Sequence, residues 1–228
     1  MTFADRRATR SRASGQREIP KGARFWEESF RAHDAGWFFG GEPSTLARRF
    51  LHFLRLMGIP TAGNLLDIGC GEGRDVVLLS SLGFDVEAID GAPTGVERAR
   101  SALKRAGLSG RVEQGDLASF EWKRDYDVIL ANHSVQFVGT EALRVLAEIR
   151  EHTTPGGWNV IGMFTREEFD WRRDDDVYCL DQRELKHIYS GWDVFEYAES
   201  IIWSPRRNGY LSFANLIARK STIGQGNQ

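Results

Sequence analysis

The fold is decided by the stretch Leu65-Leu66-Asp67-Ile68-Gly69-Cys70-Gly71-Glu72-Gly73, where a short apolar run passes into a loop of alternating glycines. The apolar run predicts a strand over residues 64–68, and the amphipathic pattern beyond the glycines predicts a helix over residues 74–82. Glycines let the backbone turn sharply and lie close against a ligand, because a Cβ would occupy the space that the ligand needs. The stretch therefore predicts a strand, a binding loop and a helix in that order.

Short apolar strands alternate with amphipathic helices from residue 64 onward, which is typical of a mostly parallel α/β sheet. Thr94 with Glu97, and Asp181 with Glu184, have the spacing of a capping box, and each pair predicts the start of a helix. Asn208-Gly209 predicts a tight turn, so an antiparallel hairpin is expected to end the sheet. Further strands are predicted at residues 84–90, 111–114, 126–131 and 158–164, and further helices at 94–105 and 140–153.

The segment before this sheet predicts two helices. Phe25, Trp26 and Phe30 stand at helical spacing, and a second helix is expected to begin at Ser44. The inner face of that second helix is predicted to consist of Leu46, Phe50, Phe53, Leu54 and Met57. We therefore divide the chain into a basic disordered arm (1–22), an N-terminal helical cap or lid (23–60), the α/β domain (61–220) and a flexible tail (221–228).

Composition narrows the class of protein. The chain has 228 residues, of which 41% are hydrophobic and 27% charged, and no apolar run approaches the ~20 residues that span a bilayer. Its two cysteines are too few for a disulfide framework or a cysteine-rich zinc site, so we expect no metal and a reducing cytoplasm. The basic arm lacks the apolar stretch of a secretory signal and is read as solvated, without nucleic-acid binding.

The loop and its acidic neighbours indicate the ligand. A dinucleotide fingerprint would need a third glycine at the position of Arg74, so a nicotinamide or flavin cofactor is disfavoured. Asp67, at the end of the first strand, supplies an acceptor for a cationic or amino-bearing ligand. Asp90 closes the second strand 21 residues after Gly69, a separation at which an acidic side chain can accept from ribose hydroxyls. Asp116 follows the third strand and could accept from an adenine amino group. Simple turn acids are the alternative at both positions.

On these residues the chain resembles the class I S-adenosylmethionine-dependent methyltransferases, over about residues 60–220. The resemblance implies a Rossmann-like, mostly parallel seven-stranded sheet with a C-terminal antiparallel hairpin and helices on both faces. It implies S-adenosyl-L-methionine as cofactor and S-adenosyl-L-homocysteine as product. The residues expected to bind the cofactor are Asp67, Gly69, Cys70, Gly71, Gly73, Arg74, Asp90, Gly91, Asp116, Leu117, Asn132 and His133.

A narrower resemblance lies in Thr154-Pro155-Gly156-Gly157 and in residues 181–197 and 213–220, which look like the tellurite-resistance methyltransferase family. That family methylates chalcogen oxyanions or thiol-type substrates, which implies a small-molecule acceptor of this kind. The family has a His-Arg pair in the hairpin before its last strand. The matching stretch here, Trp203-Ser204-Pro205-Arg206-Arg207, contains no histidine.

Methyl transfer from a sulfonium requires the nucleophile ~3–3.5 Å from the methyl carbon in a water-excluding site. A soft, ionised nucleophile needs no base. For an oxyanion, Arg206 and Arg207 are the candidate clamp, with solvated turn charges as the alternative. An oxygen or nitrogen nucleophile would need a general base, for which His133 is the candidate after the fourth strand.

Aromatic residues are the candidates for the acceptor side. Trp37, Phe38 and Phe39 stand between glycines and form either a mobile lid or a packed plug. Aromatic faces there would attract a sulfonium. Phe164, Trp171 and Tyr178 follow the fifth predicted strand and are expected to line the acceptor site.

Three other functions stay open. An O- or N-methyltransferase of a specialised metabolite is favoured if His133 is essential, a non-catalytic nucleoside-binding module if nothing is methylated, and a nicotinamide oxidoreductase if only NADH binds. The expected partner is a small-molecule methyl acceptor, with no nucleic acid and no membrane, and the protein is expected to be a monomer or homodimer.

Overall fold

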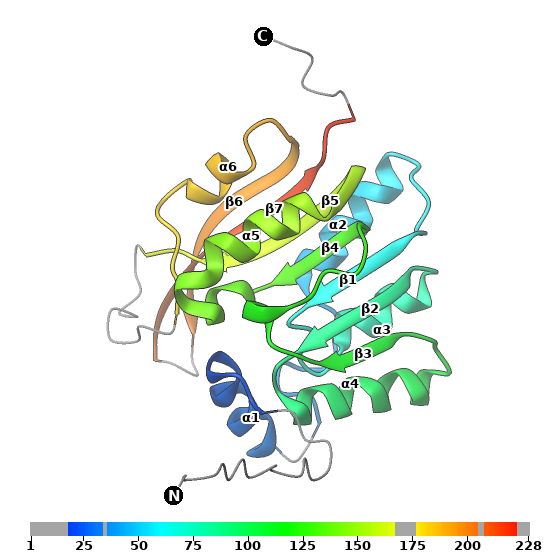
Figure 1. Cartoon of the computed structure of the whole chain (residues 1–228), viewed down its shortest axis with the longest axis vertical. Coiled ribbons are helices and arrows are strands. Elements are labelled where there is room, and N and C mark those ends of the chain that lie inside the picture. Colours follow the sequence, from blue (N-terminus) through cyan, green and yellow to red (C-terminus); the bar gives the residue numbers. More distant parts are fainter. Residues whose placement is uncertain (1–17, 34–35, 167–176, 205–207, 223–228) are drawn as a thin grey trace, which may run out of the picture.

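The computed structural model describes residues 18–33, 36–166, 177–204 and 208–222. In this part of the chain seven strands form one sheet in the order β3-β2-β1-β4-β5-β7-β6 (Figure 1). The strands are β1 (Asn64–Ile68), β2 (Asp85–Asp90), β3 (Arg111–Gln114), β4 (Tyr126–Asn132), β5 (Thr153–Phe164), β6 (Asp193–Ser204) and β7 (Gly209–Arg219). The predicted Rossmann-like sheet with its terminal hairpin is confirmed.

The directions of the strands indicate where on the sheet a ligand binds. The strand β1 pairs in parallel with both β2 and β4, whereas β7 runs antiparallel to β5 and β6. The chain therefore winds outward from β1 to β3 and then returns to the other side of β1 at β4. In open α/β sheets ligands bind at such a switch point, outside the carboxyl ends of the strands.

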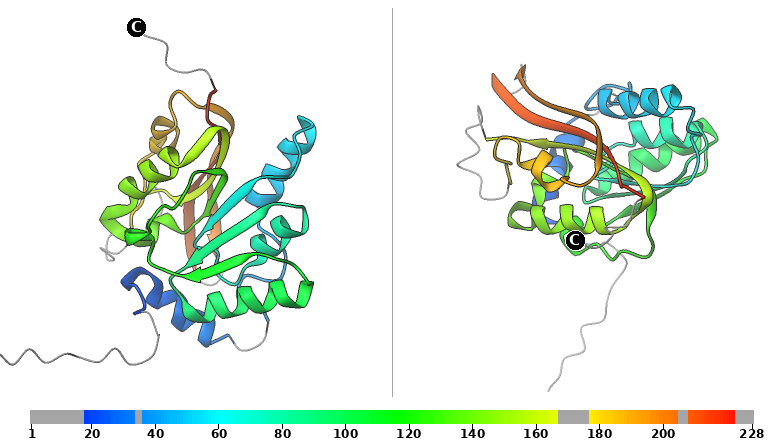
Figure 2. Two further views of the ribbon diagram at one scale, coloured as in Figure 1. Left: turned by 45° about the vertical axis from the view of Figure 1, so that its right-hand side comes forward. Right: turned by 90° about the horizontal axis from the view of Figure 1, so that it is seen from above.

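Helices cover both faces of the sheet, and α1 lies beyond the carboxyl ends of β1 and β2 (Figures 1 and 2). The α-helices are α1 (Arg24–Arg31), α2 (Thr45–Leu56), α3 (Arg74–Ser81), α4 (Pro93–Ala106), α5 (Ala142–Glu151) and α6 (Glu184–Ile188). The described residues also form the 3-10 turns η1 (Lys21–Ala23), η2 (Leu117–Ser119) and η3 (Val135–Glu141).

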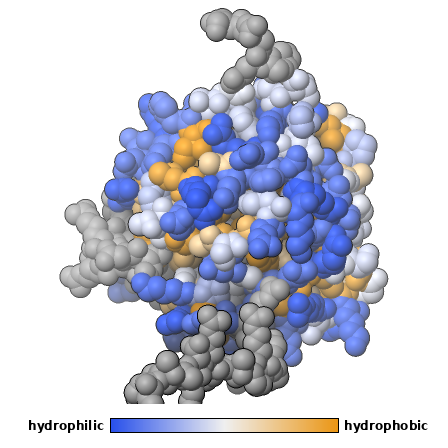
Figure 3. Space-filling model, in the orientation of Figure 1, coloured by the Kyte–Doolittle hydropathy of each residue, from blue (hydrophilic) through white to orange (hydrophobic). Residues whose placement is uncertain are grey.

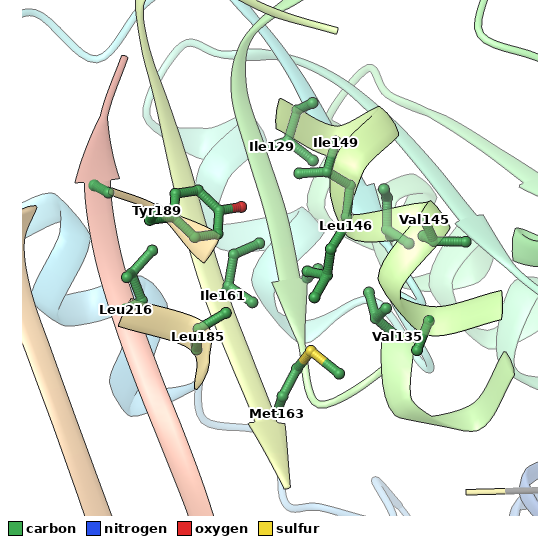
Figure 4. Packing of buried hydrophobic residues seen from close by; sticks show 14 of the residues in the cluster. Ile129, Val135, Val145, Leu146, Ile149, Ile161, Met163, Leu185, Tyr189 and Leu216 are labelled. Atoms are coloured by element: carbon green, nitrogen blue, oxygen red, sulfur yellow. The ribbon is translucent and has the colours of Figure 1, made fainter. Parts of the chain in front are cut away.

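The sheet has a separate hydrophobic core on each face. On one face, Leu146 of α5 and Leu185 of α6 pack in a cluster with Ile161 and Met163 of β5 (Figure 4). On the other face, side chains of α2, α3 and α4 form a second cluster with residues of β1, β2, β3, β4, β5 and β7. Both faces of the central strands are buried, which explains their continuous apolar sequences.

Several predicted boundaries are corrected by the structure. The helix expected at 140–153 starts as the turn η3, because Gly139 leaves the helical region (φ 58°) before α5 begins. The strand expected from residue 158 already begins at Thr153. The capping box at Thr94 is wrong, since Thr94 lies inside α4. Met57, predicted on an inner face, is exposed.

Two surface observations complete the fold. No helix among the described residues is long and apolar enough to cross a bilayer. Figure 3 shows a mainly hydrophilic face with separate apolar areas. The tail beyond residue 222 and the arm before residue 18 lie outside the described residues, whereas residues 18–22, predicted as part of the arm, lead into and begin η1.

Candidate active site

A cavity of about 500 Å³ opens at the carboxyl ends of β1, β2 and β4, at the switch point. Of the residues predicted for the site, those lining it are Asp67, Gly69, Cys70, Gly71, Arg74, Asp90, Gly91, Asp116, Leu117, Asn132, His133, Trp37, Phe39 and Phe164. Gly73, Phe38 and Tyr178 are described but do not line it. Trp171, Arg206 and Arg207 lie outside the described residues.

The glycine loop is held tightly against its neighbours. The backbone N–H groups of Gly69 and Cys70 both donate to the Ile89 carbonyl, at 2.7 and 3.1 Å. Gly69 has φ 72°, and a Cβ placed on it would lie 2.2 Å from the Cβ of Ser134. A Cβ on Gly73 would lie 2.6 Å from the Cβ of Ala99, so this glycine admits α4 rather than a ligand.

Asp90 joins the loop to the end of β2. Its Oδ2 accepts from the backbone N–H of Gly71 and its Oδ1 from that of Ala92, both at 2.8 Å. Burial raises the pKa of this carboxyl, and the backbone donors oppose the rise. Because each carboxylate oxygen has a second lone pair, Asp90 can hold the loop and still accept from a ligand in the cavity.

Asp67 is a second buried carboxyl in the cavity wall, with 3% of its surface exposed. Burial, followed by the charges of Asp75 and Asp90, raises its pKa well above the ordinary value, while Arg74 acts in the opposite direction. A cationic group that enters the cavity would favour the charged form of Asp67. This half of the site therefore suits a positively charged ligand.

The structure shows a capping role for Asp116 and an unactivated thiol at Cys70. Oδ1 of Asp116 accepts from the backbone N–H of Ala118 at 3.0 Å and caps η2, so one oxygen is used within the chain. Burial raises the pKa of the Cys70 thiol well above its usual range, and the thiol is therefore no activated nucleophile.

His133 also lines the cavity, and its backbone lies in the left-handed region with φ 57°. Its ring lies 5.5 Å from that of Phe164 and 5.2 Å from that of Phe213, between centroids. Burial, with a smaller contribution from Arg74, lowers its pKa to about 4. The imidazole is therefore neutral at pH 7, and it is a weak proton acceptor.

The N-terminal segment is hydrogen-bonded to the glycine loop, a connection that the sequence pattern did not reveal. The backbone N–H of Phe38 donates to Oε2 of Glu72 at 2.6 Å, and Nη1 of Arg98 donates to Oε1 at 2.7 Å. The backbone N–H of Ser44 donates to Oδ1 of Asp75 at 2.6 Å. Both acids are nearly fully buried, and the available signal was their place in the sequence, with Glu72 inside the glycine loop and Asp75 two residues beyond it.

The turn η1 closes part of the cavity. A Cβ on Gly22 would lie 1.8 Å from the carbonyl oxygen of Phe137, and a Cβ on Gly91 would lie 2.5 Å from the Cβ of Ala23. The turn thus touches both the β2 end and η3, and we call Pro20–Ala23 the strap. The lining residues that sequence reasoning missed include Pro20, Lys21, Gly22, Ala23, Trp26, Phe30, Phe137, Ile202, Leu211 and Phe213.

Among the described residues, no group of three or more histidine, cysteine, aspartate or glutamate side chains is arranged to hold a metal ion.

The fold is that of the class I S-adenosylmethionine-dependent methyltransferases. The solved structure of TehB from Haemophilus influenzae superposes with a TM-score of 0.66 at 24% identity, covering 76% of this chain and 62% of that one. The N-methyltransferase NodS from Bradyrhizobium japonicum WM9, solved with S-adenosyl-L-homocysteine, gives 0.66 at 21% identity over 88% and 99%.

The model of the family described as tellurite resistance protein TehB matches residues 51–206. The chain belongs to this family. It is 29% identical to the "Probable S-adenosyl-L-methionine-dependent methyltransferase TehB" of Haemophilus influenzae over 68% of this chain and 57% of that protein. It is 32% identical to "Hemagglutinin 1" of Eikenella corrodens over 68% and 54%. The chain thus spans little more than half the length of these relatives.

Proposed function

We propose that the protein transfers a methyl group from S-adenosyl-L-methionine to a small-molecule acceptor. The observation that carries this proposal is the pair of buried carboxyls, Asp67 and Asp90, on either side of a glycine loop at the switch point. A sulfonium ligand with an ammonium group and a ribose matches a buried acid beside the loop and a second acid at the end of β2. Family membership supports the same reaction.

The residues present fit this cofactor. Asp90 is proposed to accept from the ribose hydroxyls, Asp116 and Leu117 to contact the adenine, and Asp67 to face the ammonium group. The absence of a side chain at Gly71 leaves its backbone on the cavity surface. When bound, the cofactor supplies an electrophilic methyl group on a positively charged sulfur. The aromatic rings of Trp37 and Phe39 would exclude water beside it.

The family resemblance supports a chalcogen oxyanion or a thiol as acceptor. A soft, ionised nucleophile needs no base. The pKa of His133, lowered to about 4, makes this residue a weak base, which agrees with such an acceptor. Arg206 and Arg207 stay predictions as a clamp for an oxyanion. A hydroxyl or amine of a specialised metabolite is the second candidate acceptor, because His133 lines the cavity.

The proposed setting follows from the sequence: a cytoplasmic monomer or homodimer that acts without nucleic acid. The first test is isothermal titration of the protein with S-adenosyl-L-methionine, S-adenosyl-L-homocysteine and NADH, repeated on Asp90→Ala. Micromolar binding of the first two ligands that Asp90→Ala weakens at least tenfold supports the proposal. Asp85→Ala, an exposed acid at the start of the same strand, is the matched control and should bind normally.

Two results would contradict the proposal. Binding of NADH alone would favour an oxidoreductase. Binding of S-adenosyl-L-methionine without methylation of tellurite, selenite, thiols, phenols or amines would favour the non-catalytic nucleoside-binding module.

A further inference from the structure

Glu72, inside the glycine loop, is a buried acid to which the proposed function gives no role. It lines the cavity with 6% of its surface exposed. Its Oε2 accepts from the backbone N–H of Phe38 at 2.6 Å, and its Oε1 accepts from Nη1 of Arg98 in α4 at 2.7 Å. A buried carboxylate is stable when it is paired and hydrogen-bonded in this way. Both oxygens of Glu72 are therefore engaged with the chain itself.

Glu72 and Arg98 together fix a stretch of the N-terminal segment. Nη2 of Arg98 donates to the carbonyl oxygen of His33 at 2.8 Å, two residues beyond the end of α1. Glu72 binds the backbone farther along, at Phe38. We call residues 36–41 the aromatic segment. The two charged side chains thus hold the chain where it leaves α1 and again within the aromatic segment.

Successive side chains of the aromatic segment have different surroundings. Trp37 and Phe39 line the cavity, whereas Phe38 does not. The Phe38 ring packs edge-on against Trp26 and Phe30 of α1, at 6.1 and 5.9 Å between ring centroids. Phe38 is therefore packed on α1, while Trp37 and Phe39 form part of the cavity wall. We call Trp37 and Phe39 the aromatic wall.

The backbone of the aromatic segment makes the position of this wall depend on its anchors. Gly36 and Gly40 have φ 84° and 81°, and the backbone N–H of Gly40 donates to the Trp37 carbonyl at 3.0 Å. Glycines allow many other conformations when nothing holds them. The Phe39 ring is 48% exposed, and its centroid lies 5.2 Å from the Arg74 guanidinium, beside the glycine loop. The hydrogen bond from Phe38 to Glu72 thus ties the wall to the loop across which it stands.

We propose that Glu72 and Arg98 are positioning residues for the cofactor, because they hold the aromatic wall in place at the cavity. This inference rests on the proposed function. The wall contacts the bound cofactor and excludes water from it. Glu72 and Arg98 act only through the wall and take no part in the chemistry. Loss of Glu72 should therefore weaken cofactor binding only while Trp37 and Phe39 are present.

The test uses the full chain and two backgrounds, the normal protein and Trp37→Ala/Phe39→Ala, which lacks the wall. Glu72→Ala is introduced into each. Glu97→Ala removes an exposed acid next to Arg98 on α4 and is the matched control. Titration with S-adenosyl-L-homocysteine gives the Kd, and urea unfolding reports global stability. Hydrogen exchange followed by mass spectrometry reports the protection of residues 36–41 separately from that of α5.

In the normal background Glu72→Ala is expected to raise the Kd of S-adenosyl-L-homocysteine about tenfold, and in the background without the wall less than about twofold, because two changes that act through one contact are not additive. Exchange at residues 36–41 should become about tenfold faster in Glu72→Ala, with α5 unchanged. Glu97→Ala should alter neither the Kd nor the exchange. A residue that only stabilises the fold would weaken binding equally in both backgrounds.

Three results overturn the inference: an unchanged Kd in Glu72→Ala, a tenfold rise that persists without the wall, or normal protection of residues 36–41 in Glu72→Ala. Should Glu72→Ala fail to fold, Arg98→Ala takes its place, since it leaves the Phe38 hydrogen bond intact. A rise in Kd of about threefold that disappears without the wall then supports the inference, and an unchanged Kd overturns it. If S-adenosyl-L-homocysteine does not bind the normal protein, the proposed function fails. If it binds the normal protein and the Glu72 and Arg98 variants equally well, only the positioning role fails.

Discussion

At the scale of single residues, burial decides the protonation state of the site. His133 is held with a positive φ by its backbone hydrogen bond to Gly162, at 2.9 Å, and lies between two phenylalanine rings. An imidazolium there would lose hydration without gaining a carboxylate partner, so the neutral form is favoured. The same burial has the opposite effect on the acids, because it raises the pKa of Asp67 and Asp90.

The low pKa of His133 predicts a pH-dependent stability. Between the ordinary pKa of 6.5 and about 4, the unfolded chain binds a proton at His133 that the folded chain does not. The free energy of unfolding therefore falls as the pH drops from 6.5 to 4, by roughly 1–2 kcal/mol for this partly exposed ring.

The measurement is urea unfolding at pH 7, 5.5 and 4 for the normal chain and for His133→Asn. Asparagine tolerates the left-handed backbone and does not titrate. Asp67 and Asp90 change stability in the other direction in both proteins, so the difference between the two proteins isolates His133. A difference that stays constant with pH would show that the ring titrates normally.

At the scale of elements, a residue of α1 caps α4. No side chain next to α4 caps its first turn. Glu27 performs this role from α1, since its carboxylate accepts from the backbone N–H of Thr94 at 2.8 Å and from the Thr94 hydroxyl at 2.9 Å. Glu27 also pairs with Arg31 at 2.6 Å. The negative charge lies at a helix N-terminus, where it is favourable.

Glu27→Ala is expected to lower the free energy of unfolding by about 1–2 kcal/mol, because it leaves the first turn of α4 without its cap. The neighbouring Glu28 is exposed, and Glu28→Ala should stay within about 0.5 kcal/mol. Equal effects of the two substitutions in urea unfolding would contradict the capping role.

The strap is the second element with a testable role. A Cβ on Gly22 would lie 1.8 Å from the Phe137 carbonyl oxygen, so Gly22→Ala must displace the strap from η3. The strap contains no buried residue, and stability should therefore change little. We expect the Kd of S-adenosyl-L-homocysteine to rise about tenfold, or ~1.4 kcal/mol.

Arg24→Ala, at the exposed start of α1, serves as the control for Gly22→Ala and should bind normally in the same titration. Normal binding by both variants would mean that the strap covers the cavity without contributing to affinity.

At the scale of the whole molecule, the proposed cofactor site joins parts of the chain that are far apart in the sequence. The cavity is lined by the N-terminal segment, the ends of the central strands and the terminal hairpin. A ligand that contacts these parts in the folded state alone stabilises all of them together. Binding should therefore be visible in global unfolding.

S-adenosyl-L-homocysteine at a hundred times its Kd is expected to stabilise the fold by about 2.7 kcal/mol. For a chain of this length that corresponds to a rise in Tm of roughly 5–10 °C. Differential scanning fluorimetry measures the rise, with NADH as the control ligand. An equal rise with NADH, or none with either, would contradict the assignment of the cavity.

Much of the framework was predictable because it depends on local patterns. The bounds of β1 and β3 agree with the predicted strands, because an apolar run ends at the glycine loop in β1 and because Gly110 and Gly115 flank β3. The start of α2 after Ser44 was also predicted, and Oγ of Ser44 accepts from Ala47 as an N-cap should. The start of α5 was predicted two residues too early, at residue 140, where the chain is still in η3.

The sequence by itself determined the class of fold, the glycine loop and the acids Asp67, Asp90 and Asp116 at its edge, because periodicity and glycine conformation are properties of neighbouring residues. Only the tertiary structure decided that Glu27 caps α4, that the strap lines the cavity, and that Glu72 binds the backbone of Phe38. These contacts join residues far apart in the chain. Burial shifts the pKa of a side chain and makes an unpaired polar atom costly, and it exists only once distant segments have packed together.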